Sequence, residues 1–425
     1  MARNLSEAEK SIVGEVYSST EAYDNLVILC DEFGGRLNGS PGNKAAAEFL
    51  LGKFKEYGFK NPHLEPFKCP TYKDASSSLE IVSPLSRQVP CLTLPMTPNG
   101  DLEGELVYVG EGEDLDKQKG KLAGKVVIAL NRLSPAKILE SGAAGYIWMH
   151  PFPAMGPPTG VYRSKIPAVS VKHEDGMMLR RLVERKGKVK ARLSAKCTQI
   201  ETTSWNVCGE IPGNGASDEF VMFGGHYDGH EIAQAAFDCG APCTISTEVG
   251  RVLSTVSESL DRNVRVVLFS SEEFGCQGSQ DYSVKHAEDM KKMRFTYQLD
   301  CTSGPGQQYV TTAFWPELEP FYAKLADDLN MCIPHEQRMG PGDTRAFMAL
   351  GIPTGCILDY RAPTSLSILE TYRHTYFDTV DKIDFGHMRD ATIIGAISGY
   401  RMLNAKKWPK HRTPEEMKKL KIGAE

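Results

Sequence analysis

The chain has 425 residues, 41% of them hydrophobic and 24% charged, which excludes a disordered polypeptide and predicts two globular units. Forty-nine Lys and Arg against 54 Asp and Glu give a net charge of -5. Because no long basic block occurs, this balance argues against nucleic acid or an anionic membrane as the main partner. A peptide or another small molecule is the expected substrate.

The chain carries no apolar segment of the kind that crosses a membrane or directs secretion. Its longest aliphatic runs, such as residues 126–130, are far shorter than the roughly 18 residues of a membrane span. The polar start MARNLSEAEK lacks the pattern of a secretory signal. We therefore expect a cytoplasmic protein, or an extracellular one if a leader was removed. The 11 cysteines, without a CxxC pair, predict reduced thiols rather than a disulfide framework.

The first hundred residues predict helices followed by short strands. Residues 7–30 and 41–58 have helical periodicity, and Ser40-Pro41 between them has the residue types of a helix start. Residues 61–89 alternate in polarity and predict short strands at an antiparallel edge. Residues 101–197 contain a series of short strand-like segments and predict an inserted β-rich module. Its strands are expected near 105–110, 125–132, 143–150, 165–171 and 188–194, and a helix is expected near 174–185.

Strands and helices alternate in the rest of the chain. Four apolar segments, residues 219–226, 264–269, 294–299 and 354–360, are separated by helical patterns near 242–257, 278–291 and 317–329. Such alternation predicts a mainly parallel sheet covered by helices on both faces. Residues 1–100 and 198–425 are therefore expected to form one α/β catalytic domain, which the module at 101–197 interrupts.

Three of these predicted strands end in residues that can bind metals. The first is followed by His226 and Asp228, the second by Glu272 and Glu273, and the third by Asp300. Because ligands of open α/β sheets bind outside the carboxyl ends of the strands, these side chains should converge.

Imidazoles and carboxylates without thiolates suit hydrolysis assisted by two Zn²⁺ ions, with Co²⁺ or Mn²⁺ as substitutes. Two such ions need a bridging carboxylate, and Asp238 sits in a turn that could hold one rigidly. Glu272 and Glu273 point in different directions if the segment is extended, so that one can bind a metal while the other reaches a water molecule.

An ordered set of motifs, GGHYD, FDCG, SSEEFG, QLDC and RHTYFDTVDKID, resembles the co-catalytic zinc exopeptidase family of aminopeptidases and glutamate carboxypeptidases. The likeness covers nearly the whole chain, and the twelve-residue step from His226 to Asp238 is similar to that of plasma glutamate carboxypeptidase. The resemblance implies the zinc exopeptidase fold, a mixed and mainly parallel sheet between helices, with residues 101–197 as a protease-associated domain. It also makes a homodimer plausible.

The resemblance implies a role for each matching residue. Asp238 would bridge two zinc ions, Glu272 would be the general base, and the remaining ligands would be His226, Asp300, Glu273 and His374. Three ligand carboxylates against two divalent ions leave a positive pocket that favours a developing oxyanion. Asp228 and Asp378 would orient the imidazoles of the two histidines. Arg345, Arg361, Arg373 and Tyr376 are candidates for substrate contacts, although a surface ion pair or solvation for each arginine, and packing for the tyrosine, is the simpler explanation.

The sequence departs from the family at Cys239, where relatives usually have Asp or Asn after a cis peptide bond, and at Pro242 and Thr344. The predicted reaction is hydrolysis of terminal peptide bonds of small peptides by an aminopeptidase or dipeptidase. A carboxypeptidase of the plasma glutamate carboxypeptidase type stays open, because these enzymes share the metal ligands. A non-catalytic binding protein with the same fold and a one-zinc acyltransferase are further alternatives.

Overall fold

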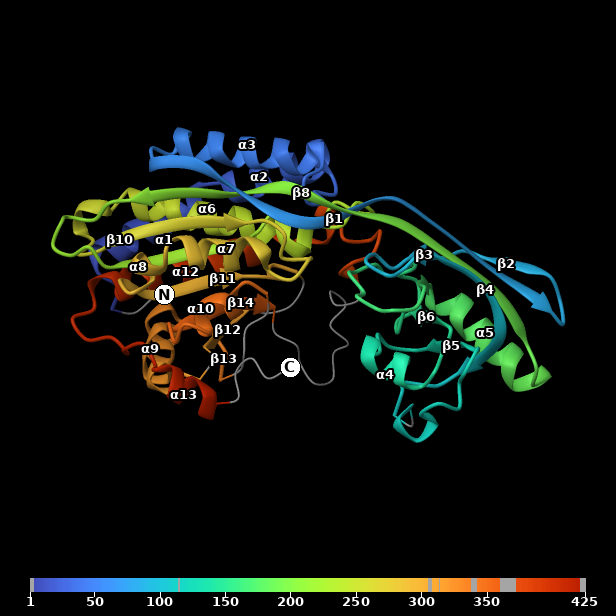
Figure 1. Ribbon diagram of the computed structural model, residues 1–425. Coiled ribbons are helices and arrows are strands. Elements are labelled where there is room, and N and C mark those ends of the chain that lie inside the picture. The colour runs from blue at the N-terminus through green and yellow to red at the C-terminus, as the bar shows by residue number, and fades with distance from the viewer. Residues whose placement is uncertain are drawn as a thin grey trace. The chain divides into compact units, whose positions relative to one another are not determined.

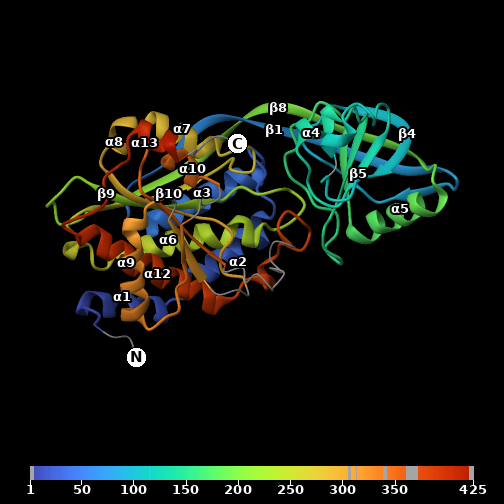
Figure 2. The same ribbon diagram turned by 90° about the horizontal axis from the view of Figure 1, so that it is seen from below.

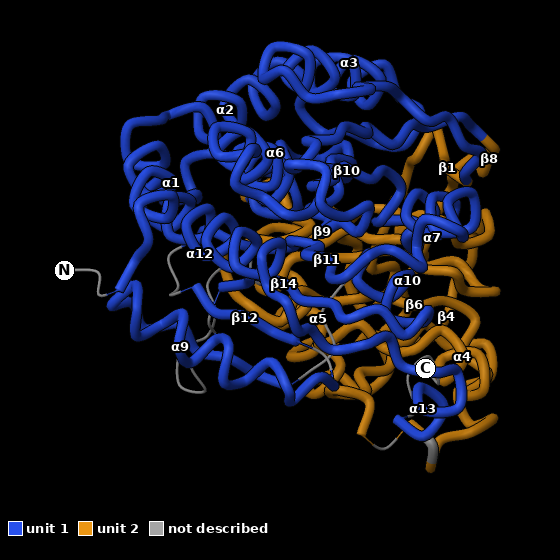
Figure 3. The backbone as a smooth tube through the Cα atoms, turned by 90° about the vertical axis from the view of Figure 1, so that its left-hand side faces the viewer, with its two compact units in different colours: residues 1–69, 202–369, 378–425 blue, residues 70–201, 370–377 orange. Residues whose placement is uncertain are grey.

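The computed structural model describes residues 4–113, 115–304, 308–312, 314–337, 342–359 and 372–420. The chain divides into two compact units (Figure 3). The first unit comprises residues 1–69, 202–369 and 378–425, and the second unit comprises residues 70–201 and 370–377. The predicted module at 101–197 thus falls within the longer segment of the second unit.

The first unit is built on a mixed, mainly parallel sheet. Its strands follow the order β13-β12-β14-β11-β9-β10-β8 (Figure 1). Strands β9, β10, β11 and β14 are parallel neighbours, whereas β12 and β8 run antiparallel to β14 and β10. The strands are β8 (Lys190–Ile211), β9 (Phe220–His226), β10 (Asn263–Phe269), β11 (Met293–Leu299), β12 (Gln308–Thr312), β13 (His335–Glu336) and β14 (Thr354–Asp359). The predicted parallel sheet is confirmed for its central strands.

Helices cover both faces of this sheet, as its continuously apolar strands require. Figure 3 shows α1, α2, α6 and α12 on one side of the strands and α7 and α10 on the other. The helices are α1 (Glu7–Ser18), α2 (Glu21–Phe33), α3 (Pro41–Glu56), α6 (Ala241–Ser254), α7 (Gln277–Lys285), α8 (Ala287–Met290), α9 (Glu319–Leu329), α10 (Thr344–Met348), α12 (Phe385–Asn404) and α13 (Pro414–Lys419).

Local sequence signals explain where several of these helices start and stop. The Ser40 side chain accepts a hydrogen bond from the Asn43 N–H at 3.1 Å, and Pro41 opens α3, so the predicted helix start is confirmed. The single helix expected over 7–30 is instead two helices, because Ser19 is extended and α2 begins after Thr20. The helix expected near 278–291 is likewise broken at His286, between α7 and α8.

The second unit has its own sheet, in the order β8-β4-β5-β6-β7-β3, with β4 to β7 parallel. Along β5, Val126 and Ile128 belong to one hydrophobic cluster and Val127 and Ala129 to another, so both faces of the sheet are buried. Helix α5 packs against the first cluster through Leu179, and α4 against the second through Ile138. The elements are β2 (Arg87–Val89), β3 (Leu92–Thr93), β4 (Gly100–Tyr108), β5 (Val126–Ala129), β6 (Gly145–Met149), β7 (Ala168–Val171), α4 (Pro135–Glu140) and α5 (His173–Lys186).

Two long strands contain two of the points where the chain passes between the units. Strand β1 (Lys60–Ser83) and strand β8 pair with each other (Figure 2), and the unit boundaries at residues 69/70 and 201/202 lie inside them. The prediction of several short strands over 61–89, and of a strand that closes near 194, is therefore wrong in length. Local periodicity marks where a strand begins but does not show that pairing continues through the proline positions of β1.

None of the helices in the described ranges combines the length and apolar composition that a membrane crossing requires. All 11 cysteines are thiols outside disulfide bonds, and all but Cys91 and Cys332 are buried. This agrees with the prediction of thiols rather than a disulfide framework.

Candidate active site

The carboxyl end of β9 carries the first group of candidate ligands. The entire strand is buried, and His226 at its end is only 1% exposed. His226 Nδ1 lies 3.2 Å from the Asp228 carbonyl oxygen and 3.5 Å from Asp228 Oδ1. The Nδ1 proton therefore faces Asp228, which leaves Nε2 as the atom available to a metal. The structure thus places Asp228 where the sequence assigned it, beside the imidazole of His226.

Asp228 also joins the ends of two strands. Its Oδ1 accepts a hydrogen bond from the Glu272 N–H at 3.1 Å, and its Oδ2 accepts one from the Glu273 N–H at 3.3 Å. This carboxylate therefore sets the position of the Glu272-Glu273 backbone, which follows β10, relative to His226.

Asp238 lies in the short turn of residues 236–240 that precedes α6. The Asp238–Cys239 peptide bond is cis. Asp378 accepts hydrogen bonds from the N–H groups of Phe237 at 2.7 Å and Asp238 at 3.1 Å. Asp378, which the sequence assigned to His374, thus contacts the backbone that carries Asp238.

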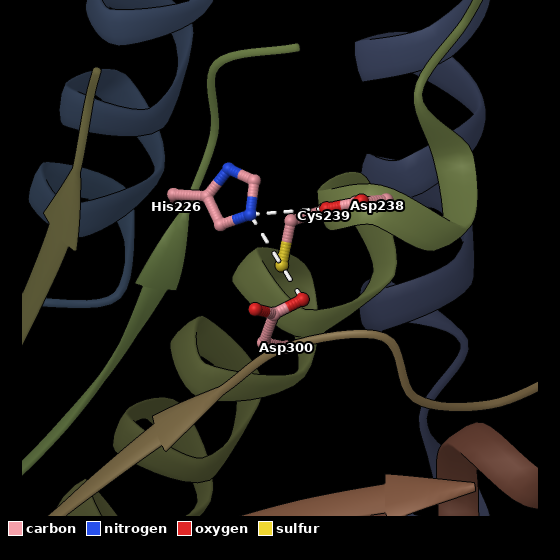
Figure 4. Close-up of side chains that lie close together, drawn as sticks. All are labelled: His226, Asp238, Cys239 and Asp300. Atoms are coloured by element: carbon pink, nitrogen blue, oxygen red, sulfur yellow. Dashed lines mark ion pairs between the residues drawn. The ribbon is translucent and has the colours of Figure 1, made fainter. Parts of the chain in front are cut away.

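His226, Asp238, Asp300 and Cys239 form one buried cluster (Figure 4). His226 Nε2 lies 3.1 Å from Asp238 Oδ1 and 4.0 Å from Asp300 Oδ1, and one ligand atom from each of the four residues lies within 4.8 Å of the others. The structure thus brings together three predicted ligands of one metal. It adds the Cys239 thiol, whose only sequence signal was its position directly after Asp238.

The two adjacent glutamates face different imidazoles. Glu272 Oε2 lies 3.9 Å from His226 Nε2, whereas Glu273 Oε2 lies 3.1 Å from His230 Nε2. Both contacts are within the first unit. Sequence reasoning missed His230, although the pattern GGHYDGH places it four residues after His226.

The carboxylates of Asp300 and Glu272 both lie beside the backbone of Gly342. A Cβ atom added to Gly342, whose φ is +55°, would lie 2.9 Å from Asp300 Oδ2 and 3.0 Å from Glu272 Oε1. Only glycine fits this position, because the backbone is left-handed and the two carboxylates occupy the space of a side chain. Burial raises the pKa of Glu272 well above its usual value, and the charges of Glu273 and Asp300 raise it further.

The buried acids predict that the metal-free protein is more stable at mildly acidic pH. Burial raises the pKa of Asp343 to about 7 and that of Asp378 to about 6. The folded state therefore retains protons that the unfolded chain, with carboxyl pKa values near about 3.9, has already released. This contribution to stability is present at low pH and is lost as the pH rises through the folded pKa values.

Between about pH 8 and about pH 5, we expect the free energy of unfolding of metal-free protein to rise by a few kcal/mol. Urea denaturation at each pH, after chelation and desalting, measures this change. Zinc-loaded protein should show a weaker dependence, because a cation favours the ionised carboxylates. A denaturation midpoint of metal-free protein that increases with pH over the same range would contradict this interpretation.

Arg36 connects the N-terminal region to the loop between His226 and Asp238. It is fully buried, and its guanidinium donates hydrogen bonds to five carbonyl oxygens. Three of these acceptors lie between His226 and Asp238 in sequence: the carbonyl oxygens of Tyr227 (2.5 Å), Gln234 (2.7 Å) and Ala235 (2.8 Å). The other two, of Gly34 and Leu29, lie in the N-terminal region. No sequence pattern marks Arg36, because its hydrogen-bond acceptors are backbone carbonyl groups, which every residue has.

Two asparagines of the same N-terminal segment hold the end of β10. Asn38 Nδ2 donates to Ser271 Oγ at 2.7 Å, and Asn43 Nδ2 donates to Ser270 Oγ at 3.0 Å and to the Arg36 carbonyl at 3.2 Å. Residues 36–43 therefore contact the hydroxyl groups of the two serines that precede Glu272, as well as the loop that carries Asp238.

The other predicted residues are His374, Arg373, Tyr376, Arg345 and Arg361. Residues 372–377 belong to the second unit, where the His374 carbonyl accepts a hydrogen bond from the Thr159 N–H at 2.8 Å and Arg373 Nε lies 3.3 Å from His374 Nε2. In that unit, Tyr376 is 49% exposed. Arg345 is exposed on α10 of the first unit, and Arg361 is outside the described residues. Substrate contacts of these side chains stay predictions.

The chain is similar to known peptidases over most of its length. It is 23% identical to carboxypeptidase Q of Mus musculus, a match that covers 93% of this chain and 89% of the relative. A solved peptidase M28 precursor from Shewanella amazonensis SB2B has a TM-score of 0.83 at 24% identity, and the match covers 95% of this chain and 97% of that one. A zinc aminopeptidase from Bacillus subtilis, BSAP, has a TM-score of 0.74 at 21% identity, with coverage of 91% and 96%.

The solved structures confirm the predicted mixed α/β fold with a mainly parallel sheet. Residues 206–396, which include β9, β10, β11, β14 and the buried cluster, match the sequence profile of peptidase family M28. This part of the chain is therefore similar to peptidase family M28, and the relatives that match most of the chain are peptidases, which are hydrolases.

Proposed function

We propose that this chain is a zinc exopeptidase that releases a terminal residue from small peptides, with Glu272 as the general base. The observation that carries the proposal is the buried cluster of His226, Asp238 and Asp300, with the Glu272 carboxylate 3.9 Å from His226 Nε2. The relative named as a zinc aminopeptidase supports zinc as the metal.

The residues present fit zinc. The donor set of imidazole and carboxylate oxygens is one that Zn²⁺ prefers. His226 Nε2 is buried without a hydrogen bond, although its carboxylate neighbours lie close by. Like charges raise the pKa of Glu272, and a divalent cation in the cluster would reverse this unfavourable interaction.

In this proposal, His226, Asp238 and Asp300 hold one ion, and Asp238 and Glu273 contribute to a second. His374, in the second unit, is assigned to the second ion by its motif alone. Zinc, when bound, would polarise a peptide carbonyl and lower the pKa of water. Glu272 accepts a proton from the attacking water and returns it to the leaving amine. Asp228 fixes the imidazole of His226 and the Glu272 backbone during both steps.

The end of the peptide that is recognised distinguishes two candidate activities. An aminopeptidase or dipeptidase is our first choice, and BSAP, a zinc aminopeptidase, shares the fold. A carboxypeptidase is the second candidate, because carboxypeptidase Q aligns with 93% of the chain. The same metal ligands serve both activities, so the ligands do not discriminate between them.

Cleavage of free and end-blocked di- and tripeptides by zinc-loaded protein separates the two candidates. We expect N-acetylation to abolish cleavage and C-terminal amidation to leave cleavage of tripeptides largely unchanged. The opposite pattern would identify a carboxypeptidase. If neither block alters the rate, or an internal bond is cut first, the exopeptidase proposal is wrong.

A further inference from the structure

A second group of metal-binding side chains lies in the first unit, outside the active-site cluster. It consists of His63 and Glu65 on β1, Cys208 on β8 and His286 between α7 and α8. Residues 63 and 65 share one face of β1, because side chains alternate along a strand. Strand β8 pairs with β1. The break of the predicted helix at His286 occurs at this group.

Both imidazoles of this group face one carboxylate oxygen. Glu65 Oε1 lies 3.1 Å from His63 Nε2 and 2.8 Å from His286 Nε2. One atom each of His63, Glu65 and Cys208 lies within 4.8 Å of the other two. In a tetrahedral zinc site, with bonds of about 2.0–2.3 Å, ligand atoms are roughly 3.3–3.7 Å apart. His63, Glu65 and Cys208 are therefore within a small side-chain movement of that geometry, and His286 joins them through its 2.8 Å contact with Glu65.

The outer ring nitrogens of the two histidines face oxygen atoms. His63 Nδ1 lies 2.6 Å from the Asn61 carbonyl oxygen, whereas His286 Nδ1 lies 3.8 Å from Asp289 Oδ2, which is too long for a hydrogen bond. Arg265 pairs with Asp289 at 2.8 Å. Metal-binding histidines generally donate their second ring N–H to a carbonyl or a carboxylate. The arrangement leaves both Nε2 atoms directed at Glu65.

The carboxylate and the thiol are enclosed by protein. The Glu65 side chain is 13% exposed, and its Oε2 is buried without a conventional hydrogen bond. Cys208 is 4% exposed, and burial raises the pKa of its thiol well above the usual value. The His63 side chain is 51% exposed, so an ion can enter from solvent beside it.

We propose that His63, Glu65, Cys208 and His286 form a zinc site separate from the catalytic cluster. The mixture of nitrogen, oxygen and sulfur donors suits Zn²⁺ better than Mg²⁺ or Ca²⁺, which prefer oxygen. On binding, the Cys208 thiol releases its proton to solvent and the thiolate becomes a ligand. Four protein ligands leave no open position, so the site is structural and connects β1, β8 and the α7–α8 junction.

Metal content tests the proposal directly. Protein stripped with a chelator, reloaded with zinc and desalted is analysed by elemental mass spectrometry. Wild-type protein is expected to retain one more zinc ion per chain than His63→Ala, while the peptidase rates of the two proteins agree. His173→Ala, which changes a histidine of the second unit, is the matched control and should retain the wild-type content. Equal zinc content in wild type and His63→Ala would overturn the proposal.

Cobalt provides a second readout, which identifies the sulfur ligand. Co²⁺ bound to a thiolate gives a sulfur-to-metal charge-transfer absorption that imidazole and carboxylate ligands do not give. We expect this band in the wild type and in Cys239→Ala, and its loss in Cys208→Ala. Absence of the band from the wild type, or its loss in Cys239→Ala but not in Cys208→Ala, would overturn the proposal.

Discussion

Glu272→Gln is expected to keep its bound metal, whereas its kcat should decrease about 10²–10⁴-fold. Glutamine has nearly the same shape as glutamate but cannot accept a proton, so the variant removes only the proton transfer to and from the reacting groups. The Glu272 N–H bond to Asp228 involves the backbone and is unaffected by the change. Metal content and kcat, measured on the same preparation, give both quantities.

Glu273→Gln is the matched control, since it makes the same chemical change one residue away. Its carboxylate faces His230 rather than His226, and we assign it to the second ion. This variant should therefore lose activity together with metal. Near-normal peptidase activity in Glu272→Gln, with full metal content, would contradict the role of Glu272 as the base.

Arg36→Ala is expected to lower both the stability of the fold and the affinity for metal. Five carbonyl oxygens accept hydrogen bonds from this guanidinium, and a buried acceptor left unpaired costs about 1–3 kcal/mol. Since some groups will rehydrate, we expect a total loss of roughly 3–5 kcal/mol in the free energy of unfolding. The Tyr227 and Ala235 carbonyls would be released, so the turn that carries Asp238 would lose its fixed position relative to His226.

Zinc affinity, measured on three variants, separates this positioning role from a general loss of stability. Zinc affinity of Arg36→Ala should fall at temperatures at which the variant is still folded, and millimolar guanidinium should partly restore it. Arg36→Lys should not restore it, because one ammonium group cannot reach acceptors on both sides of a planar fork. Arg401→Ala removes a partly buried arginine that pairs with Glu9 and Asp328, and should lower stability without changing zinc affinity. Equal zinc affinity in Arg36→Ala and wild type would refute the positioning role.

The sequence predicted the part of the fold that local periodicity determines. Apolar segments that end in His226, Glu272 and Asp300 indicated parallel strands whose carboxyl ends meet, and the structure brings these residues together. The length of β1 was not predictable, because Pro62, Pro66 and Pro70 weaken a strand pattern. Strand β1 pairs only with β2 and β8 among the described strands, and an edge strand can accommodate proline.

The sequence predicted the site residues whose side chains could bind a metal. It did not predict residues that act through hydrogen bonds to backbone atoms. His226, Asp238 and Asp300 stand in recognisable motifs. Arg36 acts on carbonyl oxygens, which every residue has, and its acceptors at Tyr227 and Ala235 are nearly 200 positions away. The group of His63, Cys208 and His286 was equally hidden, because strand pairing and a helix break bring together residues that share no motif.

Anomalous diffraction from crystals of zinc-loaded protein, recorded on both sides of the zinc absorption edge, tests the central claim most directly. We predict a strong peak among His226 Nε2, Asp238 and Asp300, and a second peak between Asp238 and Glu273. The absence of any zinc peak from the His226 cluster in zinc-loaded, active protein would contradict this prediction.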